Sequence, residues 1–182
     1  MIETGIVGLE VIDTKKFSDE RGYFTELYNK SKSVHPEWVQ DNFSRSSRGV
    51  LRGMHFQVGE HQQAKLVRCV RGKVFDVAVD VRPKSDTFGK WFGIELDHDN
   101  GLALFVPTGF AHGFLVLSEE ADVLYKVSGY YRPGAERGLH WNDPNVSIDW
   151  ERYLCGRDPI LHTRDAGFKG IGDLENELRG SW

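Results

Sequence analysis

The sequence predicts an all-β protein, best described as an antiparallel jelly roll with a few short peripheral helices. Short runs of strand-forming residues follow one another along the chain, and turn signals separate them. A helical spacing of apolar residues is confined to residues 30–37 and 174–179. A jelly roll encloses a concave interior lined by alternate residues of its strands, and we expect a ligand to bind there.

The clearest strand spans residues 73–82. Its odd-numbered positions from Phe75 to Val81 are apolar, and its other face carries two aspartates, which is the period of two typical of a strand. The Asp-Asn-Gly sequence at 99–101 and the Pro-Thr-Gly sequence at 107–109 are turn signals between such runs. In chain order, the expected strands are residues 22–27, 50–57, 64–71, 73–82, 90–96, 102–106, 113–117 and 121–128.

The size and composition of the chain suit one folded domain. It has 182 residues, of which 40% are hydrophobic, so it can bury a sizeable core. No linker, low-complexity segment or convincing repeat interrupts the sequence. We therefore expect one domain over residues 1–182, with a core over about 17–150 and a C-terminal segment, 151–182, that packs on this core.

Charge, cysteines and hydropathy restrict the partners and the cellular location. The formal net charge of −4 argues against nucleic-acid binding, which requires a basic face, although a local basic cluster still permits a small anionic ligand. Cys69 and Cys155 are too few for a disulfide framework, and we expect free thiols. No run is apolar enough to span a membrane, and residues 1–4 show no signal-peptide pattern, so we expect a cytoplasmic protein without membrane contacts.

Two lone histidines indicate a site for acid–base chemistry. His55 and His112 each lie in a run of glycines and apolar residues, and Arg52 and Lys65 flank the first of them. An imidazole titrates near neutral pH, so in an apolar pocket it can accept a proton and return it. The neighbouring cations can hold an anion or stabilise negative charge that develops during a reaction. If the strands bring these segments together, they form a catalytic constellation.

Eight runs of the sequence match a known family, in the same order and over most of the chain. They are residues 17–26, 39–47, 49–57, 63–69, 75–82, 109–114, 124–126 and 141–144. One short run would be weak evidence, but so many in register are a strong signal. The chain resembles the dTDP-4-dehydrorhamnose 3,5-epimerases, which are nucleotide-sugar epimerases built on a cupin-type jelly roll.

The resemblance implies an epimerase that inverts C3 and/or C5 of a dTDP-4-keto-6-deoxyhexose. Such an enzyme serves deoxysugar biosynthesis of the dTDP-L-rhamnose type, which supplies cell-surface polysaccharides, and it needs neither a metal nor another cofactor. It removes a proton beside the ketone and returns it to the opposite face through an enolate. By family match, His55 is the base and Asp165 orients it. Tyr125 is the acid, and Lys65 stabilises the enolate oxygen.

The resemblance also implies how the nucleotide sugar binds and how the subunits associate. Arginine suits a diphosphate because its planar fork donates two parallel hydrogen bonds, and Tyr131 matches a position that stacks on the thymine ring. The family is homodimeric, so Arg21 and Glu26 are expected to reach the site of the partner subunit. The expected substrate-binding residues are Arg21, Glu26, Gln40, Asn42, Arg52, His112 and Tyr131.

Three alternative functions stay open at this point. Related enzymes invert only C3 or only C5, and no motif records that difference. A non-catalytic jelly roll would bind sugars and use its lone histidines structurally. The third alternative is a metal-dependent cupin oxygenase or isomerase. Such proteins usually have a close pair of histidines, which this sequence lacks, so the metal ligands would have to be His55, Glu60, His61 and His112.

Overall fold

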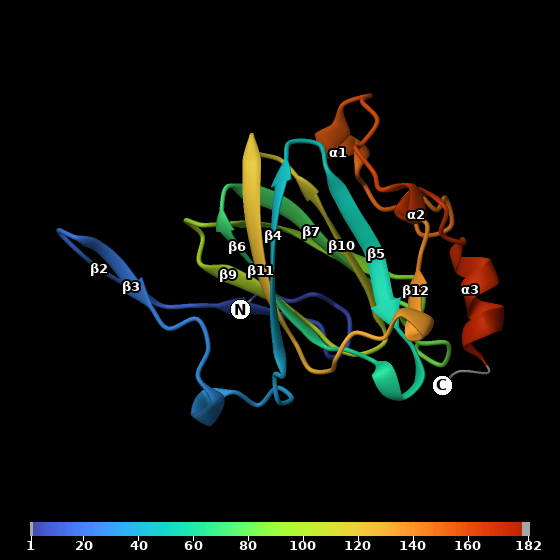
Figure 1. The fold of residues 1–182 in the computed structure, drawn as a ribbon, viewed down its shortest axis with the longest axis horizontal. Coiled ribbons are helices and arrows are strands. Elements are labelled where there is room, and N and C mark those ends of the chain that lie inside the picture. The colour runs from blue at the N-terminus through green and yellow to red at the C-terminus, as the bar shows by residue number, and fades with distance from the viewer. Residues whose placement is uncertain (1, 180–182) are drawn as a thin grey trace.

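Two five-stranded antiparallel sheets face each other in the computed structural model, which describes residues 2–179 (Figure 1). Sheet one has the strand order β1 (Glu10–Asp13), β9 (Leu102–Val106), β6 (Lys65–Arg71), β11 (Glu120–Val127) and β4 (Gln40–Ser47). Sheet two has the order β12 (Glu136–Gly138), β5 (Leu51–Gln57), β10 (Phe110–Val116), β7 (Lys73–Asp80) and β8 (Trp91–Asp97). This arrangement confirms the predicted all-β jelly roll.

Smaller elements surround the two sheets. A separate hairpin of β2 (Lys16–Asp19) and β3 (Gly22–Thr25) projects away from the body of the molecule (Figure 1). The helices α1 (Glu151–Leu154), α2 (Thr163–Ala166) and α3 (Ile171–Leu178) follow the last strand, on the opposite side from this hairpin. Single 3-10 turns occur at η1 (Lys30–Lys32), η2 (Gly59–His61) and η3 (Pro133–Ala135).

Apolar residues form three clusters, one between the sheets and one on each outer face. The cluster between the sheets includes Val67 of β6 and Phe114 of β10. The outer face of sheet two is covered by the C-terminal segment, whose Trp150 and Leu174 pack in one cluster with Phe75 of β7. The outer face of sheet one forms a smaller cluster with the segment before β4. All but the first residue of β7 are therefore buried, since both faces of this strand are covered.

Most expected strands occur with bounds within a few residues of the prediction, but some elements differ. The expected helix over residues 30–37 is wrong, because only the turn η1 forms and Ser33 is already extended. Pro36 also opposes a helix over this segment, since a proline disfavours helical backbone at the residue before it, which is His35 here. The sequence analysis also missed β1, β2, β4 and β12, and β10 begins at Phe110, earlier than the expected residue 113.

Two findings bear on the thiols and on membranes. Cys69 and Cys155 are both free, as expected from their spacing. Between residues 2 and 179, no helix has the length and apolarity needed to cross a membrane. The first residue and the last three residues of the expected domain lie outside the described part of the chain.

Candidate active site

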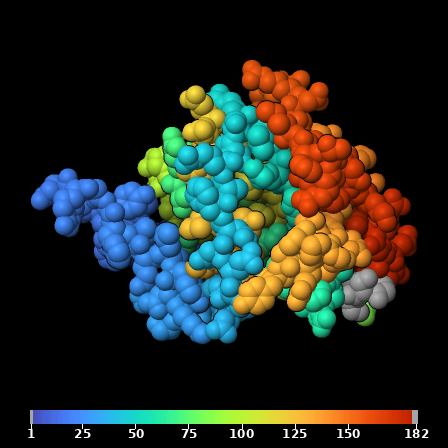
Figure 2. Space-filling model, in the orientation of Figure 1, coloured from blue at the N-terminus to red at the C-terminus, as the bar shows by residue number. Residues whose placement is uncertain are grey.

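A cavity of about 660 Å³ opens between the two sheets, with walls from both of them and from the C-terminal segment. Figure 2 shows the hollow between β4, the segment that follows β11, and the C-terminal segment. Its lining carries the cations Arg52, Lys65 and Arg164 but only two carboxylates, those of Glu136 and Asp165. The cavity thus has a local excess of positive charge although the chain is acidic overall, which suits an anionic ligand.

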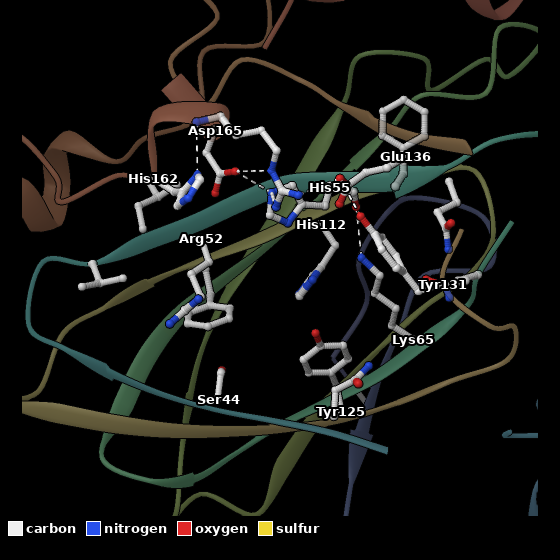
Figure 3. Close-up of a pocket in the computed structure, with 18 of the residues that line it drawn as sticks. Ser44, Arg52, His55, Lys65, His112, Tyr125, Tyr131, Glu136, His162 and Asp165 are labelled. Atoms are coloured by element: carbon white, nitrogen blue, oxygen red, sulfur yellow. Dashed lines mark hydrogen bonds and ion pairs between the residues drawn. The ribbon is translucent and has the colours of Figure 1, made fainter. Parts of the chain in front are cut away.

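His55 and Asp165 form a hydrogen-bonded pair at one wall of the cavity (Figure 3). His55 Nε2 lies 2.9 Å from Asp165 Oδ1, and the histidine side chain is 25% exposed, whereas that of the aspartate is 4% exposed. An ionised carboxylate only accepts hydrogen bonds, so Nε2 carries the hydrogen and Nδ1 keeps its lone pair. The ring of Phe168 meets the imidazole edge-on at 5.5 Å and holds its plane. This arrangement suits a general base with an orienting partner.

The surroundings of Asp165 keep it ionised. Burial would raise the pKa of Asp165, but the hydrogen bond and charge of His55, the Gly53 amide and the Arg164 charge together lower it. The Gly53 N–H donates to Oδ2 at 3.3 Å, which fixes the second carboxylate oxygen. Gly53 also lets β5 approach β10 closely, because a Cβ at this position would come within 2.5 Å of Gly113 Cα. Gly53 and Gly113 therefore let the two neighbouring strands lie close together, which positions the backbone that carries His55.

Lys65 begins β6 in the opposite sheet and is buried at the inner end of the cavity. Its Nζ donates to the backbone carbonyl of His55 at 3.0 Å. Burial lowers the pKa of Lys65 to about 8, and the charges of Asp76 and Glu136 oppose that shift. The side chain therefore carries most of its charge at neutral pH in a poorly hydrated position, where a cation interacts strongly with a developing negative charge.

Tyr125 lies across the cavity from His55, as Figure 3 shows. It is on β11 of sheet one, paired with Asn42 of β4, whereas His55 is on β5 of sheet two. Burial raises the pKa of Tyr125, although the charge of Arg52 opposes this shift, so the hydroxyl keeps its proton at neutral pH. An imidazole with a free lone pair and a protonated phenol thus face each other from opposite walls.

His112 forms a second, buried pair with Asp76. Its Nε2 lies 2.9 Å from Asp76 Oδ1, and its strand β10 runs beside β5, with His112 opposite His55 in register. The sequence placed Asp76 on a strand but gave no sign that it partners a histidine. The second oxygen of Asp76 has no hydrogen-bond partner within the described residues.

Three expected substrate-binding residues line the wall and the mouth of the cavity. Arg52 Nε donates to Ser46 Oγ at 2.9 Å, and among residues 2–179 the two terminal nitrogens of its guanidinium have no hydrogen-bond partner, so they can bind an anion. Gln40 and Asn42 alternate along β4 and face the cavity, where the Gln40 amide donates to Asn42 Oδ1 at 2.7 Å. These side chains are anchored by each other and by the sheet, so they present fixed donors.

Tyr131 belongs to a polar cluster that the sequence analysis largely missed. Its hydroxyl donates to Glu136 Oε2 at 3.1 Å, and Arg164 Nη1 donates to the same oxygen at 2.7 Å. Arg164 Nε also reaches Asp165 Oδ1 at 3.4 Å, so this cluster adjoins the histidine–aspartate pair. Arg164 stands directly before Asp165 in sequence, which was a usable signal, whereas Glu136 carries no motif.

Arg21 and Glu26 lie outside the cavity, unlike the other nine predicted site residues. Arg21 is at the turn of the projecting hairpin, with its side chain 84% exposed and paired with Asp19 at 2.6 Å. Glu26 follows the hairpin and pairs with Lys32 at 2.7 Å. Within one subunit, then, neither side chain reaches His55.

The four residues named for a metal site are not gathered in one place. Glu60 and His61 pair with each other at 3.7 Å on the exposed turn η2 and do not line the cavity. His55 and His112 are each hydrogen-bonded to an aspartate instead. Among residues 2–179, no group of three or more histidine, cysteine, aspartate or glutamate side chains has the arrangement of a metal site.

Comparison with known proteins gives a consistent match. The family model described as dTDP-4-dehydrorhamnose 3,5-epimerase matches residues 3–173. The dTDP-4-dehydrorhamnose 3,5-epimerase of Escherichia coli K12 is 48% identical over 174 residues, which cover 91% of this chain and 94% of the relative.

Two solved structures are similar over nearly their whole length. The dTDP-6-deoxy-D-glucose-3,5-epimerase from Legionella pneumophila Philadelphia 1, in complex with dTDP-4-keto-L-rhamnose, has a TM-score of 0.90 and 43% identity and covers 97% of this chain and 95% of its own. A 3'-monoepimerase from Streptomyces bikiniensis, in complex with dTDP-quinovose, has a TM-score of 0.87 and 32% identity, with coverage of 99% and 91%.

Proposed function

The chain belongs to the dTDP-4-dehydrorhamnose 3,5-epimerase family, and from this premise we propose that His55 and Tyr125 move the protons of the epimerisation. The enzyme is an isomerase that inverts C3, C5 or both in a dTDP-4-keto-6-deoxyhexose. The observation that carries the residue assignment is the position of the His55–Asp165 pair, opposite Tyr125 across one cavity (Figure 3).

His55 is the general base in this proposal. The lone pair on Nδ1 takes a proton from a carbon beside the C4 ketone, while Asp165 holds the other ring nitrogen and stabilises the imidazolium that forms. The carbon–hydrogen electron pair moves toward the carbonyl and gives an enolate. Asp165 is a positioning residue, because it contacts the base and not the sugar.

Lys65 and Tyr125 complete the cycle. The Lys65 ammonium stabilises the enolate oxygen, where its low exposure strengthens the attraction. The Tyr125 hydroxyl then donates a proton to the same carbon from the opposite face, and the ketone re-forms with the carbon inverted. Proton exchange with water returns His55 to the neutral form and Tyr125 to the protonated form, so the net reaction is isomerisation alone.

The rest of the cavity suits the nucleotide end of the substrate. The guanidinium of Arg52, which Ser46 orients, provides two parallel donors for the diphosphate. Tyr131 is 46% exposed at the mouth, where its ring can stack on the thymine base. Gln40, Asn42 and His112 supply further polar contacts along the walls.

A single-carbon epimerase is the second candidate function. The similarity to a 3'-monoepimerase, with a TM-score of 0.87, favours keeping this candidate. Both enzymes would use the same base and acid, and they would differ in whether the second carbon can reach His55. The position of the isotopic label in the experiment below separates them.

The assembly and the location of the enzyme are further parts of this proposal. The position of Arg21 on the projecting hairpin, outside the cavity of its own subunit, supports a homodimer in which Arg21 and Glu26 complete the partner's site. The two free thiols support a cytoplasmic enzyme of deoxysugar biosynthesis for cell-surface polysaccharides. The C-terminal segment shares a cluster with sheet two, which supports one domain over the whole chain.

Deuterium exchange tests the proposed roles. The wild-type enzyme, incubated with dTDP-4-keto-6-deoxyglucose in deuterium oxide, should place label at the inverted carbons, as located by NMR. His55→Asn should abolish the exchange while binding of dTDP, followed by calorimetry, persists. Tyr125→Phe should still exchange the proton but invert about 10²-fold or more slowly, because the acid is missing. Full exchange by His55→Asn would remove His55 as the base, and unimpaired inversion by Tyr125→Phe would remove the acid.

A further inference from the structure

We propose that Glu136 is a positioning residue that holds the active-site cation Arg164 beside His55 and connects it to Tyr131. This inference rests on the proposed function, because it assigns a task beside the proposed base. It explains a feature that anion binding alone does not, namely a carboxylate in the wall of a cavity that receives a diphosphate. An unpaired carboxylate at this place would repel the diphosphate, so its presence calls for an interaction with the cavity's own cations.

The contacts of Glu136 form a continuous chain from the nucleotide end to the base. One oxygen, Oε2, accepts from the Tyr131 hydroxyl at 3.1 Å and from Arg164 Nη1 at 2.7 Å. Arg164 in turn has its Nε 3.4 Å from Asp165 Oδ1 and its Nη2 3.5 Å from His55 Nε2. The guanidinium therefore lies between two carboxylates and touches the base that one of them orients.

Arg164 opposes protonation of the neighbouring imidazole, and Glu136 offsets that effect. A positive charge next to His55 disfavours the imidazolium that the reaction must form. The Glu136 carboxylate neutralises this charge and also holds the guanidinium in place. The Glu136 side chain is only 16% exposed, so water screens this ion pair weakly. Burial lowers the pKa of Arg164, but the charges of Glu136 and Asp165 raise it by more. The pKa therefore lies above its ordinary value, and the arginine stays charged.

Glu136 also favours the protonated form of Lys65. Burial lowers the pKa of Lys65 to about 8, and the negative charges of Asp76 and Glu136 are what keep it from falling further. Glu136 thus supports the protonated form of the enolate-stabilising lysine and the protonated form of the base. The charged and titratable groups that share the cavity with His55 are Asp165 and Arg164 of α2, His162 at the start of α2, Glu136 of β12, Tyr131, Lys65 of β6, His112 of β10, Tyr125 of β11, and Arg52 of its own strand.

The test is the pH dependence of kcat/KM, which reports the acid and the base of the free enzyme. Glu136→Gln keeps the shape but removes the charge, so both limbs of the profile should move to lower pH by about half a unit or more. Arg164→Gln removes the opposing charge, so the acid limb should move to higher pH. A purely structural role would lower the whole profile without moving its limbs, and that result would overturn the inference.

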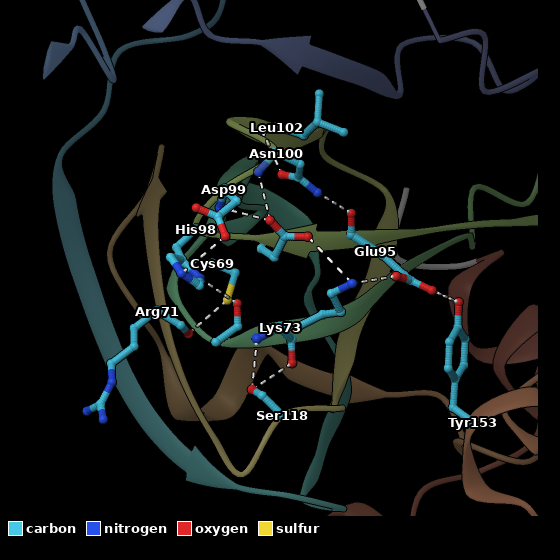
Figure 4. Close-up of polar contacts among 12 residues, drawn as sticks. Cys69, Arg71, Lys73, Glu95, His98, Asp99, Asn100, Leu102, Ser118 and Tyr153 are labelled. Carbon is cyan, nitrogen blue, oxygen red and sulfur yellow. Dashed lines mark hydrogen bonds and ion pairs between the residues drawn. The ribbon is translucent and has the colours of Figure 1, made fainter. Parts of the chain in front are cut away.

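Glu95→Gln is the matched control for the change at Glu136. Glu95 also accepts from a tyrosine and a cation, since Tyr153 OH lies 2.9 Å from Oε1 and Lys73 Nζ lies 3.2 Å from Oε2 (Figure 4). It is on β8, which β10 and β7 separate from β5, and it does not line the cavity. The folded Glu95→Gln variant should keep both limbs at the wild-type pH. Equal movement of the limbs in both variants would mean that distant charges account for the effect.

A titration that needs no turnover separates this inference from the proposed function. The His55 ring signals of the ligand-free protein can be followed by NMR and assigned by their loss in His55→Asn. Their midpoint should fall in Glu136→Gln and rise in Arg164→Gln. A wild-type protein that exchanges no substrate hydrogen contradicts the proposed function, whereas an active enzyme whose His55 midpoint is the same in all variants contradicts only the role of Glu136.

Discussion

Lys65 illustrates how burial prepares a single side chain for catalysis. An ammonium at the surface is screened by water, whereas Lys65 is 8% exposed and donates to the backbone of the residue that bears the proposed base. The same burial lowers its pKa to about 8. The stronger attraction for an enolate therefore comes with a charge that is lost just above neutral pH.

We expect an alkaline limb in the activity profile that belongs to Lys65. Lys65 is charged below pH 8 and neutral above it, so kcat/KM should fall about tenfold for each pH unit above this value if the cation is required. Tyr125 is not the source of this limb, because burial raises its pKa above the ordinary value of 10.0. Arginine keeps its charge, so the residual activity of Lys65→Arg should be flat to about pH 10. A wild-type profile that is flat to this pH contradicts the assignment.

The residues found from the sequence are those that sit in motifs, and the missed ones act through partners distant in the chain. The resemblance to the family named His55, Lys65, Tyr125 and Asp165, and all four line one cavity. Asp76 meets a histidine 36 positions away, through the pairing of β7 with β10. The bond from Arg164 to Glu136 likewise spans 28 positions. The register of the strands and the packing of α2 decide such pairs, and a single sequence states neither.

The same limit applies to whole elements. Strand β4 escaped prediction because it has no apolar face: its inward residues Gln40, Asn42 and Ser44 line the cavity and are polar for that reason. Strand β7 was the easiest to predict, and its face with Asp76 and Asp80 is as buried as its apolar face. The hydrophobic pattern identifies strands that build the core, and it fails where a strand builds the site.

Helix α3 is a local element whose packing can be tested separately. Leu174 is 1% exposed and belongs to the cluster on the outer face of sheet two. Leu174→Ala should lower the free energy of unfolding by about 2–5 kcal/mol, measured by urea denaturation, since it leaves a cavity. Asn176→Ala, on the exposed face of the same helix, should change it by no more than about 0.5 kcal/mol. Equal effects at the two positions would show that α3 does not pack on the sheet in solution.

At the scale of the whole molecule, the hairpin of β2 and β3 is the feature that one subunit does not explain. It projects away from the body of the molecule (Figure 1), and Phe24 is 69% and Phe17 53% exposed. The centroids of these two rings lie 6.4 Å apart, and the rings contact each other. Exposed aromatic side chains beside a charged turn are typical of a surface that meets another protein. The proposed homodimer would account for both the exposed rings and the position of Arg21 outside its own cavity.

Subunit mixing tests this assembly by function. Arg21→Ala and His55→Asn should each lose activity, but a mixed dimer has one site that combines His55 of the first variant with Arg21 of the second. Equal mixing of co-refolded chains should therefore restore about a quarter of wild-type activity, because half of the dimers are mixed and each has one intact site. His55→Asn mixed with Tyr125→Phe should restore none, since both residues line the cavity of the same chain. No recovery in the first mixture, or a sedimentation mass of one 20.7 kDa chain at full activity, contradicts the shared site.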